Sequence, residues 1–171
     1  MGTSIMTRLM ALDVGEARIG VAISDSSRFL ASPYTTLHVS RDETQTWAAI
    51  QQLIDELEPA GLVIGLPISL DGQLHAQGQR VQAFAERLKQ HISIPLTFWD
   101  ERLSTVEAQR LLAERDQLAK GKRQQRGNAQ RTRTNRTKRR QKGQEIDALA
   151  AAVILQEYLD SLSRKTEETH I

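Results

Sequence analysis

The apolar and polar positions near the start of the chain follow a pattern that is typical of a β-hairpin. Leu9–Val14 is a nearly continuous apolar run, which predicts a strand buried on both faces. After a turn at Gly15–Ala17, the segment Arg18–Ser24 alternates with a period of two. One face of this second strand carries only the small residues Gly20, Ala22 and Ser24. We therefore expect an antiparallel hairpin with one face kept small.

Strands and helices alternate along the rest of the chain. Strands are predicted at Pro33–Val39, Leu62–Ile64 and Ile94–Trp99. Helices are predicted after a Ser40–Glu43 capping box, over Val81–Ile92, after a second capping box at Ser104–Glu107, and over Glu145–Leu159. Three initial strands followed by alternating helices and strands indicate an α/β fold, a mixed five-stranded sheet with its later strands parallel and helices flanking it.

Length and composition bound the kind of protein. The 171 residues favour one domain over 1–171, with a polar, loose tail over 160–171. No segment has the length and apolarity of a transmembrane helix, and the N-terminus does not resemble a signal peptide, so we expect no membrane association. The absence of cysteine excludes disulfides, thiolate catalysis and cysteine metal sites.

The charge is distributed unevenly, although the net charge is only +2. Residues 117–144 contain eleven Lys or Arg and no acid, and the remainder of the chain contains 12 basic and 21 acidic residues. This composition cannot build a core, so we expect a flexible basic insertion at about 117–144. Such a segment on an acidic body favours a polyanionic partner, although a solvated run without a specific partner has the same composition.

Three acids lie next to apolar runs that belong to different elements. Asp13 interrupts the first strand, Glu101 directly follows the last strand, and Asp147 lies in the first turn of the last helix. Asp13 alone is compatible with a turn residue that caps its own loop, and Asp100 with Glu101 is compatible with favourable charge at a helix N-terminus. In the predicted topology, however, Asp13, Glu101 and Asp147 can converge at one end of the sheet.

Three clustered carboxylates repel one another unless divalent cations neutralise them. Oxygen ligands suit Mg²⁺ or Mn²⁺, and two such ions about 4 Å apart can support phosphodiester cleavage. Gly15 in the hairpin turn, with Gly65 and Pro67 after a buried strand, would form the loops near this site. The candidates for phosphate binding are Arg102, Arg136, Lys138, Arg139 and Arg140. Arg102 could equally be the salt-bridge partner of a nearby acid.

Four ordered motifs carry a resemblance to a known family. ALDVGEARIGVAISD, VIGLPISLDGQ, DERLSTVEAQRLL and EIDALAAAVILQEYL, spread over residues 8–159, resemble the YqgF-like, Holliday-junction-resolvase-like pre-16S rRNA nucleases. The resemblance implies a ribonuclease-H-like fold, a cytoplasmic location and a metal-dependent nuclease that trims the 5′ end of the small-subunit rRNA precursor. It also implies that Asp13, Glu101 and Asp147 are the metal-binding catalytic acids. The chain departs from the family in its much longer basic stretch, which puts the placement of Asp147 in question.

Other functions remain open at this stage. RNA and branched DNA present the same phosphate charge, so a Holliday-junction-type DNA resolvase is an alternative. A non-catalytic RNA-binding ribosome-assembly factor would need only the basic segment. A small actin-like ATPase also begins with an Asp-x-Gly hairpin, but this chain lacks room for the second domain that would close over a nucleotide. The sequence does not predict an oligomeric state.

Overall fold

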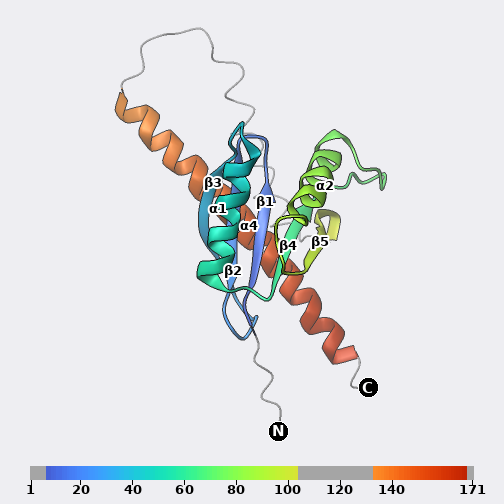
Figure 1. The fold of residues 1–171 in the computed structure, drawn as a ribbon. Coiled ribbons are helices and arrows are strands. Elements are labelled where there is room, and N and C mark those ends of the chain that lie inside the picture. The colour runs from blue at the N-terminus through green and yellow to red at the C-terminus, as the bar shows by residue number, and fades with distance from the viewer. Residues whose placement is uncertain (1–6, 104–132, 169–171) are drawn as a thin grey trace.

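A mixed five-stranded sheet organises the structure (Figure 1). This computed structural model describes residues 7–103 and 133–168, apart from the side chains of residues 103, 133–140 and 166–168. The strands are Leu9–Val14 (β1), Arg18–Ser24 (β2), Ala31–His38 (β3), Gly61–Leu66 (β4) and Leu96–Asp100 (β5). Their order is β3-β2-β1-β4-β5, with β1, β2 and β3 antiparallel and β4 and β5 parallel to β1. The mixed sheet expected from the sequence is confirmed.

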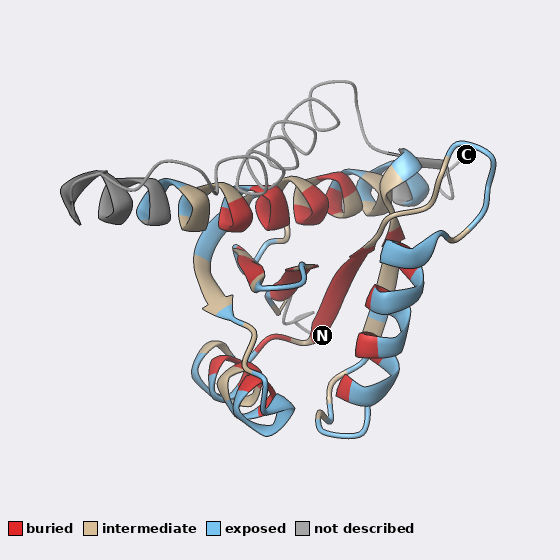
Figure 2. Cartoon of the chain, turned by 90° about the horizontal axis from the view of Figure 1, so that it is seen from above, coloured by how far each residue is buried: buried red, intermediate tan, exposed pale blue. Residues whose placement is uncertain are grey.

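Helices cover both faces of this sheet. They are Glu43–Leu57 (α1), Ala76–Leu88 (α2) and Arg133–Glu168 (α4), with a 3-10 turn at Glu101–Leu103 (η1). Helices α1 and α2 lie on one face, and α4 crosses the other and extends past the sheet at both ends (Figures 1 and 2). The helix predicted after Ser104 falls outside the described residues. No helix in the described part of the chain is long and apolar enough to cross a membrane.

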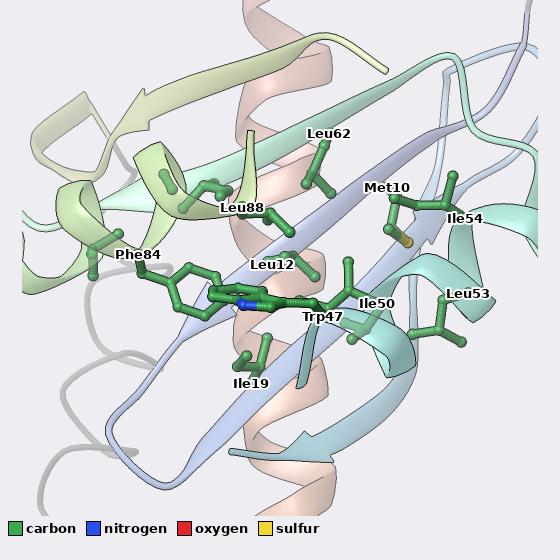
Figure 3. Packing of buried hydrophobic residues seen from close by; sticks show 14 residues of the cluster. Met10, Leu12, Ile19, Trp47, Ile50, Leu53, Ile54, Leu62, Phe84 and Leu88 are labelled. Carbon is green, nitrogen blue, oxygen red and sulfur yellow. The ribbon is translucent and has the colours of Figure 1, made fainter. Parts of the chain in front are cut away.

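The alternation along β1 and β2 divides the core into two layers. Met10, Leu12 and Ile19 point toward α1 and α2 (Figure 3), and they are fully buried in one cluster with Val21. Trp47 of α1 completes this layer. Its ring packs on the ring of Phe84 in α2, with the two ring centroids 4.9 Å apart. Each large apolar side chain buried in this way contributes about 1.5–3 kcal/mol. This layer anchors the strands that carry the candidate site.

The small residues of β2 lie beneath α4. A Cβ atom on Gly20 would lie only 1.9 Å from the carbonyl oxygen of Asp147, so the helix backbone touches the strand there. Ala22 of β2 and Ala151 of α4 are both fully buried in the same layer. The small face expected from the sequence is confirmed, and it exists because α4 packs unusually close to the sheet.

The limits of α4 differ from those predicted. The helix begins at Arg133 rather than at Glu145, and it continues to Glu168 through most of the segment predicted to be a loose tail. Residues 133–144 include no apolar side chain, which suggested a loop. Their Arg, Lys and Gln residues are nevertheless good helix formers and include no proline, so they extend a helix already stabilised by packing. The part of the predicted insertion before residue 133 lies outside the described residues.

The N-terminus of α1 also differs from its prediction. The cap is Asp42, whose carboxylate accepts a hydrogen bond from the Thr44 backbone N–H at 3.0 Å. Ser40 instead donates its hydroxyl to the Gln45 side chain. The capping-box pattern therefore located the helix but placed its cap two residues too early, because Asp caps as readily as Ser.

Candidate active site at the carboxyl end of the parallel strands

Asp13 is held near the end of the central strand. It is the fifth residue of β1 and is only 7% exposed. Its register partner across the hairpin is Gly20, and its neighbours Leu12 and Val14 pack toward the opposite face. Alternation therefore directs the Asp13 side chain to the α4 face of the sheet. A buried carboxylate in this position requires hydrogen-bonding or charged partners.

Asp147 approaches the same place from α4. It is 7% exposed, and its backbone carbonyl lies against Gly20, the register partner of Asp13. Because paired strands are about 5 Å apart, this contact brings the Asp147 backbone close to Asp13. Asp147 lies four turns inside α4, not in the first turn as predicted, since the helix begins earlier. The close packing on Gly20, rather than a helix terminus, sets its position.

Glu101 reaches the same face from the end of β5. It opens η1, is partly buried, and places its Oε1 atom 2.7 Å from where a Cβ of Gly65 would be. Gly65 follows Ile64, which pairs with Leu12 beside Asp13. Glycine at this position leaves the space that the Glu101 carboxylate and Ile154 of α4 fill. The three acids singled out from the sequence thus lie on the α4 side of the sheet, toward the carboxyl ends of β1, β4 and β5.

Arg18 already neutralises the charge of one of these acids, Asp147. The Arg18 Nε–H donates to Oδ2 of Asp147 and forms an ion pair with it. Both side chains are largely buried, with 19% and 10% exposed. Sequence reasoning did not identify Arg18, because its partner is 129 residues away and no local pattern marks the pair. A cation placed two residues before the small face of β2 is the only hint in the sequence.

The donor set suits a hard divalent cation, since all three acids supply oxygen. Within residues 7–103 and 133–168, however, no three His, Asp or Glu side chains form a group that could hold a metal ion. What the described residues show directly is that Arg18 pairs with Asp147. The chemistry of the residues fits Mg²⁺ or Mn²⁺.

Arg102 forms the salt bridge that was one of its two predicted roles. Its Nε donates to both carboxylate oxygens of Asp100 at 3.0 Å, and one terminal nitrogen donates to Oδ2 at 2.6 Å. These hydrogen bonds hold the pKa of Asp100 below its usual range and raise the pKa of Arg102. Asp71, in the loop after β4, adds an attractive charge to Arg102. The pair therefore braces the end of β5 beside Glu101.

The predicted loop residues have mainly structural contacts. The Gly15 N–H donates to the Arg18 carbonyl in the hairpin turn. The Pro67 carbonyl lies against α2, 2.6 Å from where a Cβ of Gly78 would be. The basic residues Arg136, Lys138, Arg139 and Arg140 belong to the N-terminal part of α4, and their side chains lie outside the description.

Comparison with known proteins identifies the family. The family described as "RuvX: Holliday junction resolvase" matches residues 7–130. The chain belongs to the RuvX family. A RuvX relative from Thermoanaerobacter pseudethanolicus, named "Putative pre-16S rRNA nuclease", is 42% identical over 158 residues, which are 92% of this chain and 99% of the relative. A relative of the same name from Roseiflexus sp. is 40% identical over 154 residues, covering 90% of this chain and 94% of the relative.

The solved structure titled "T. thermophilus RuvC in complex with Holliday junction substrate" is similar in fold, and the alignment covers 91% of this chain and 96% of the RuvC chain. The TM-score is 0.48 and the sequence identity is 12%. The mixed five-stranded sheet with helices on both faces is the α/β architecture that the sequence predicted.

Proposed function

We propose that this protein is a divalent-metal-dependent nuclease that processes the 5′ end of the pre-16S rRNA, in the cytoplasm. The observation that carries the proposal is the convergence of Asp13, Glu101 and Asp147 from three elements onto one face of the sheet. Burial of two of these acids is costly for folding, so a role in binding cations explains why they are there. The names of the RuvX relatives support the choice of RNA as substrate.

The three acids would have different roles in metal binding, according to how rigidly each is held. Asp13 lies on the central strand and would provide the fixed ligand, while Asp147 and Glu101 would complete the site from α4 and η1. A divalent ion bound there supplies the positive charge that water activation and departure of the leaving oxygen both require. Close packing of α4 on Gly20 limits the movement of Asp147 relative to Asp13.

The basic part of the chain would bind the phosphate backbone. The first part of α4 extends past the sheet and continues directly into the turn that contains Asp147 (Figure 1). Arg136, Lys138, Arg139 and Arg140 lie two to about three turns before Asp147 along the helix axis. Nucleic acid bound along this part of α4 would therefore lead toward the acids. Arg102 would contribute charge at the other side of the site while it remains paired with Asp100.

The alternative substrate is a four-way DNA junction, which the description of the family model favours. The test offers pre-16S rRNA, single-stranded RNA and a four-way DNA junction side by side, with Mg²⁺ or Mn²⁺. We expect site-specific cleavage of the rRNA precursor. Cleavage of the junction alone would replace the RNA substrate with DNA. Binding without any cleavage would favour the non-catalytic assembly factor.

The same assay tests the site residues. Asp13→Asn, Glu101→Gln and Asp147→Asn each remove a ligand charge at nearly constant volume, so each should abolish cleavage in a folded protein. Asp55→Asn is the matched control, because Asp55 is an exposed carboxylate on α1, away from the site. A variant of the three that cleaves at the wild-type rate with saturating metal would remove that residue from the site.

A further inference from the structure

The ion pair between Arg18 and Asp147 lies inside the proposed site. Arg18 is the first residue of β2 and lies on the same face of the hairpin as Gly20, next to α4. Its guanidinium also passes Gly143, one turn before Asp147, where a Cβ would be 3.5 Å from two of the guanidinium nitrogens. The side chain is therefore aligned along the helix between residues 143 and 147.

This position makes Arg18 the counterion of a buried acid. Asp147 is 7% exposed, and an ionised carboxylate with so little access to water requires a compensating cation. The Arg18 Nε–H provides one directly at Oδ2. A divalent ion at the proposed site would have to bind the same carboxylate. Arg18 and the metal would then compete for the charge of Asp147, since two cations close to one carboxylate repel each other.

We propose that Arg18 is a positioning residue that substitutes for the metal cation at Asp147 in the metal-free protein and weakens metal binding there. The inference rests on the proposed function, because it assigns metal binding to Asp147. Arg18 keeps the Asp147 side chain oriented toward the site while no metal is bound. When metal binds, Arg18 loses its exclusive contact with Oδ2.

A purely structural ion pair would behave differently. If Arg18 only attached the hairpin to α4, its removal would destabilise the protein and leave the intrinsic metal affinity unchanged or reduced. Competition instead predicts two opposite effects of removing Arg18: the metal-free protein becomes less stable, and it binds metal more tightly. The two quantities can be measured separately on the same variants, and neither requires catalytic activity.

The experiment compares wild type, Arg18→Gln and Arg18→Lys in thermal unfolding and in calorimetric titration with Mn²⁺. Without metal, we expect Arg18→Gln to lower the Tm by about 4 °C or more, because Asp147 loses its partner. The same variant should bind Mn²⁺ about tenfold more tightly than wild type and gain a larger Tm increase on metal addition. Arg18→Lys keeps the charge but not the planar guanidinium, so its Tm and its Mn²⁺ affinity should lie between those of wild type and Arg18→Gln.

Two controls assign the effect. Arg80→Gln removes another arginine that pairs with an acid, Glu16 of the same hairpin, but this pair is exposed and should leave both quantities unchanged. In an Asp147→Asn background, Arg18→Gln should no longer alter Mn²⁺ affinity, because the shared carboxylate is gone.

Each result bears on a distinct claim. Unchanged or weaker Mn²⁺ binding by Arg18→Gln, with normal binding by wild type, would overturn the inference and leave the metal site in place. If Arg18→Gln does not fold, Arg18→Lys decides the matter, and a Mn²⁺ affinity equal to that of wild type would overturn the inference. Absence of Mn²⁺ binding by wild type itself would remove the metal site, and this inference with it.

Discussion

Gly20 of β2 and the backbone of Asp147 in α4 are in direct contact. A Cβ atom on Gly20 would lie 1.9 Å from the Asp147 carbonyl oxygen and 2.4 Å from its carbonyl carbon. Gly20 is also the register partner of Asp13. One glycine therefore sets the depth at which α4 packs and the separation of two candidate catalytic acids.

Replacing Gly20 with alanine should push α4 away from the sheet. Backbone atoms cannot move aside as a flexible side chain can, so we expect a loss of at least about 2–3 kcal/mol in the free energy of unfolding, measured by urea denaturation. Gly143→Ala is the matched control in the same interface. Its Cβ would make only ordinary contacts with Arg18, and the helix should gain up to about 1 kcal/mol. Equal stability of Gly20→Ala and wild type would show that the helix is not held against this strand.

Replacing Gly65 with alanine should reduce both activity and stability. The new Cβ would meet Glu101 Oε1 at 2.7 Å and Ile154 Cδ1 at 2.6 Å, both at the ends of side chains that can rotate. We expect cleavage to fall by about tenfold or more, with about 1–3 kcal/mol lost in stability.

A second substitution separates these two effects of Gly65→Ala. Ile154→Val removes the Cδ1 atom, so the double variant should recover stability but not activity. Recovery of full activity in that double variant would mean that the position of the Glu101 carboxylate does not matter for cleavage.

The basic part of α4 should provide affinity and not chemistry. Replacing Arg136, Lys138, Arg139 and Arg140 with Gln should weaken nucleic-acid binding strongly and flatten its salt dependence. Each phosphate contact contributes about 0.7 to the logarithmic salt slope for single strands, and we expect a slope set by about four to six contacts in wild type. Binding titrations at several salt concentrations measure the slope, and single-turnover cleavage at saturating RNA should change little.

The control for this variant is Arg87→Gln with Lys89→Gln, two exposed cations at the end of α2 that pair with acids. These changes should leave the salt slope unaltered. An unaltered slope in the α4 variant as well would mean that the basic helix is only solvated. A collapsed single-turnover rate at saturation would place its side chains in the active site.

Asp25 should contribute to stability in acid. The Leu30 N–H, the Ser27 hydroxyl and the Phe29 N–H donate to its carboxylate and lower its pKa from 3.8 to about 2. A depressed pKa in the folded state means that the stabilisation is complete above pH 3.8 and is lost as the pH falls toward about 2. The Tm difference between wild type and Asp25→Asn should therefore be constant at neutral pH and shrink over that interval. A difference that does not depend on pH would assign the effect to the hydrogen bonds without the charge.

The local pattern of the sequence determined much of this structure. The apolar run at Leu9–Val14 and the period of two over Arg18–Ser24 predicted a buried hairpin, and both strands lie at those residues. The small face of β2 predicted a close neighbour, which α4 provides. These features follow from burial and alternation, which depend on residues close together in the chain.

Tertiary packing decided the features that couple distant residues. Arg18 engages Asp147 across 129 positions because α4 packs on the sheet, and Gly65 gives room to Glu101 because β5 pairs beside β4. The start of α4 at Arg133 could not be predicted from the local sequence pattern either. A polar segment continues a helix once the apolar part beyond it is packed on the sheet. Sequence alone could name the acids, and only packing could show which cation and which glycines set their positions.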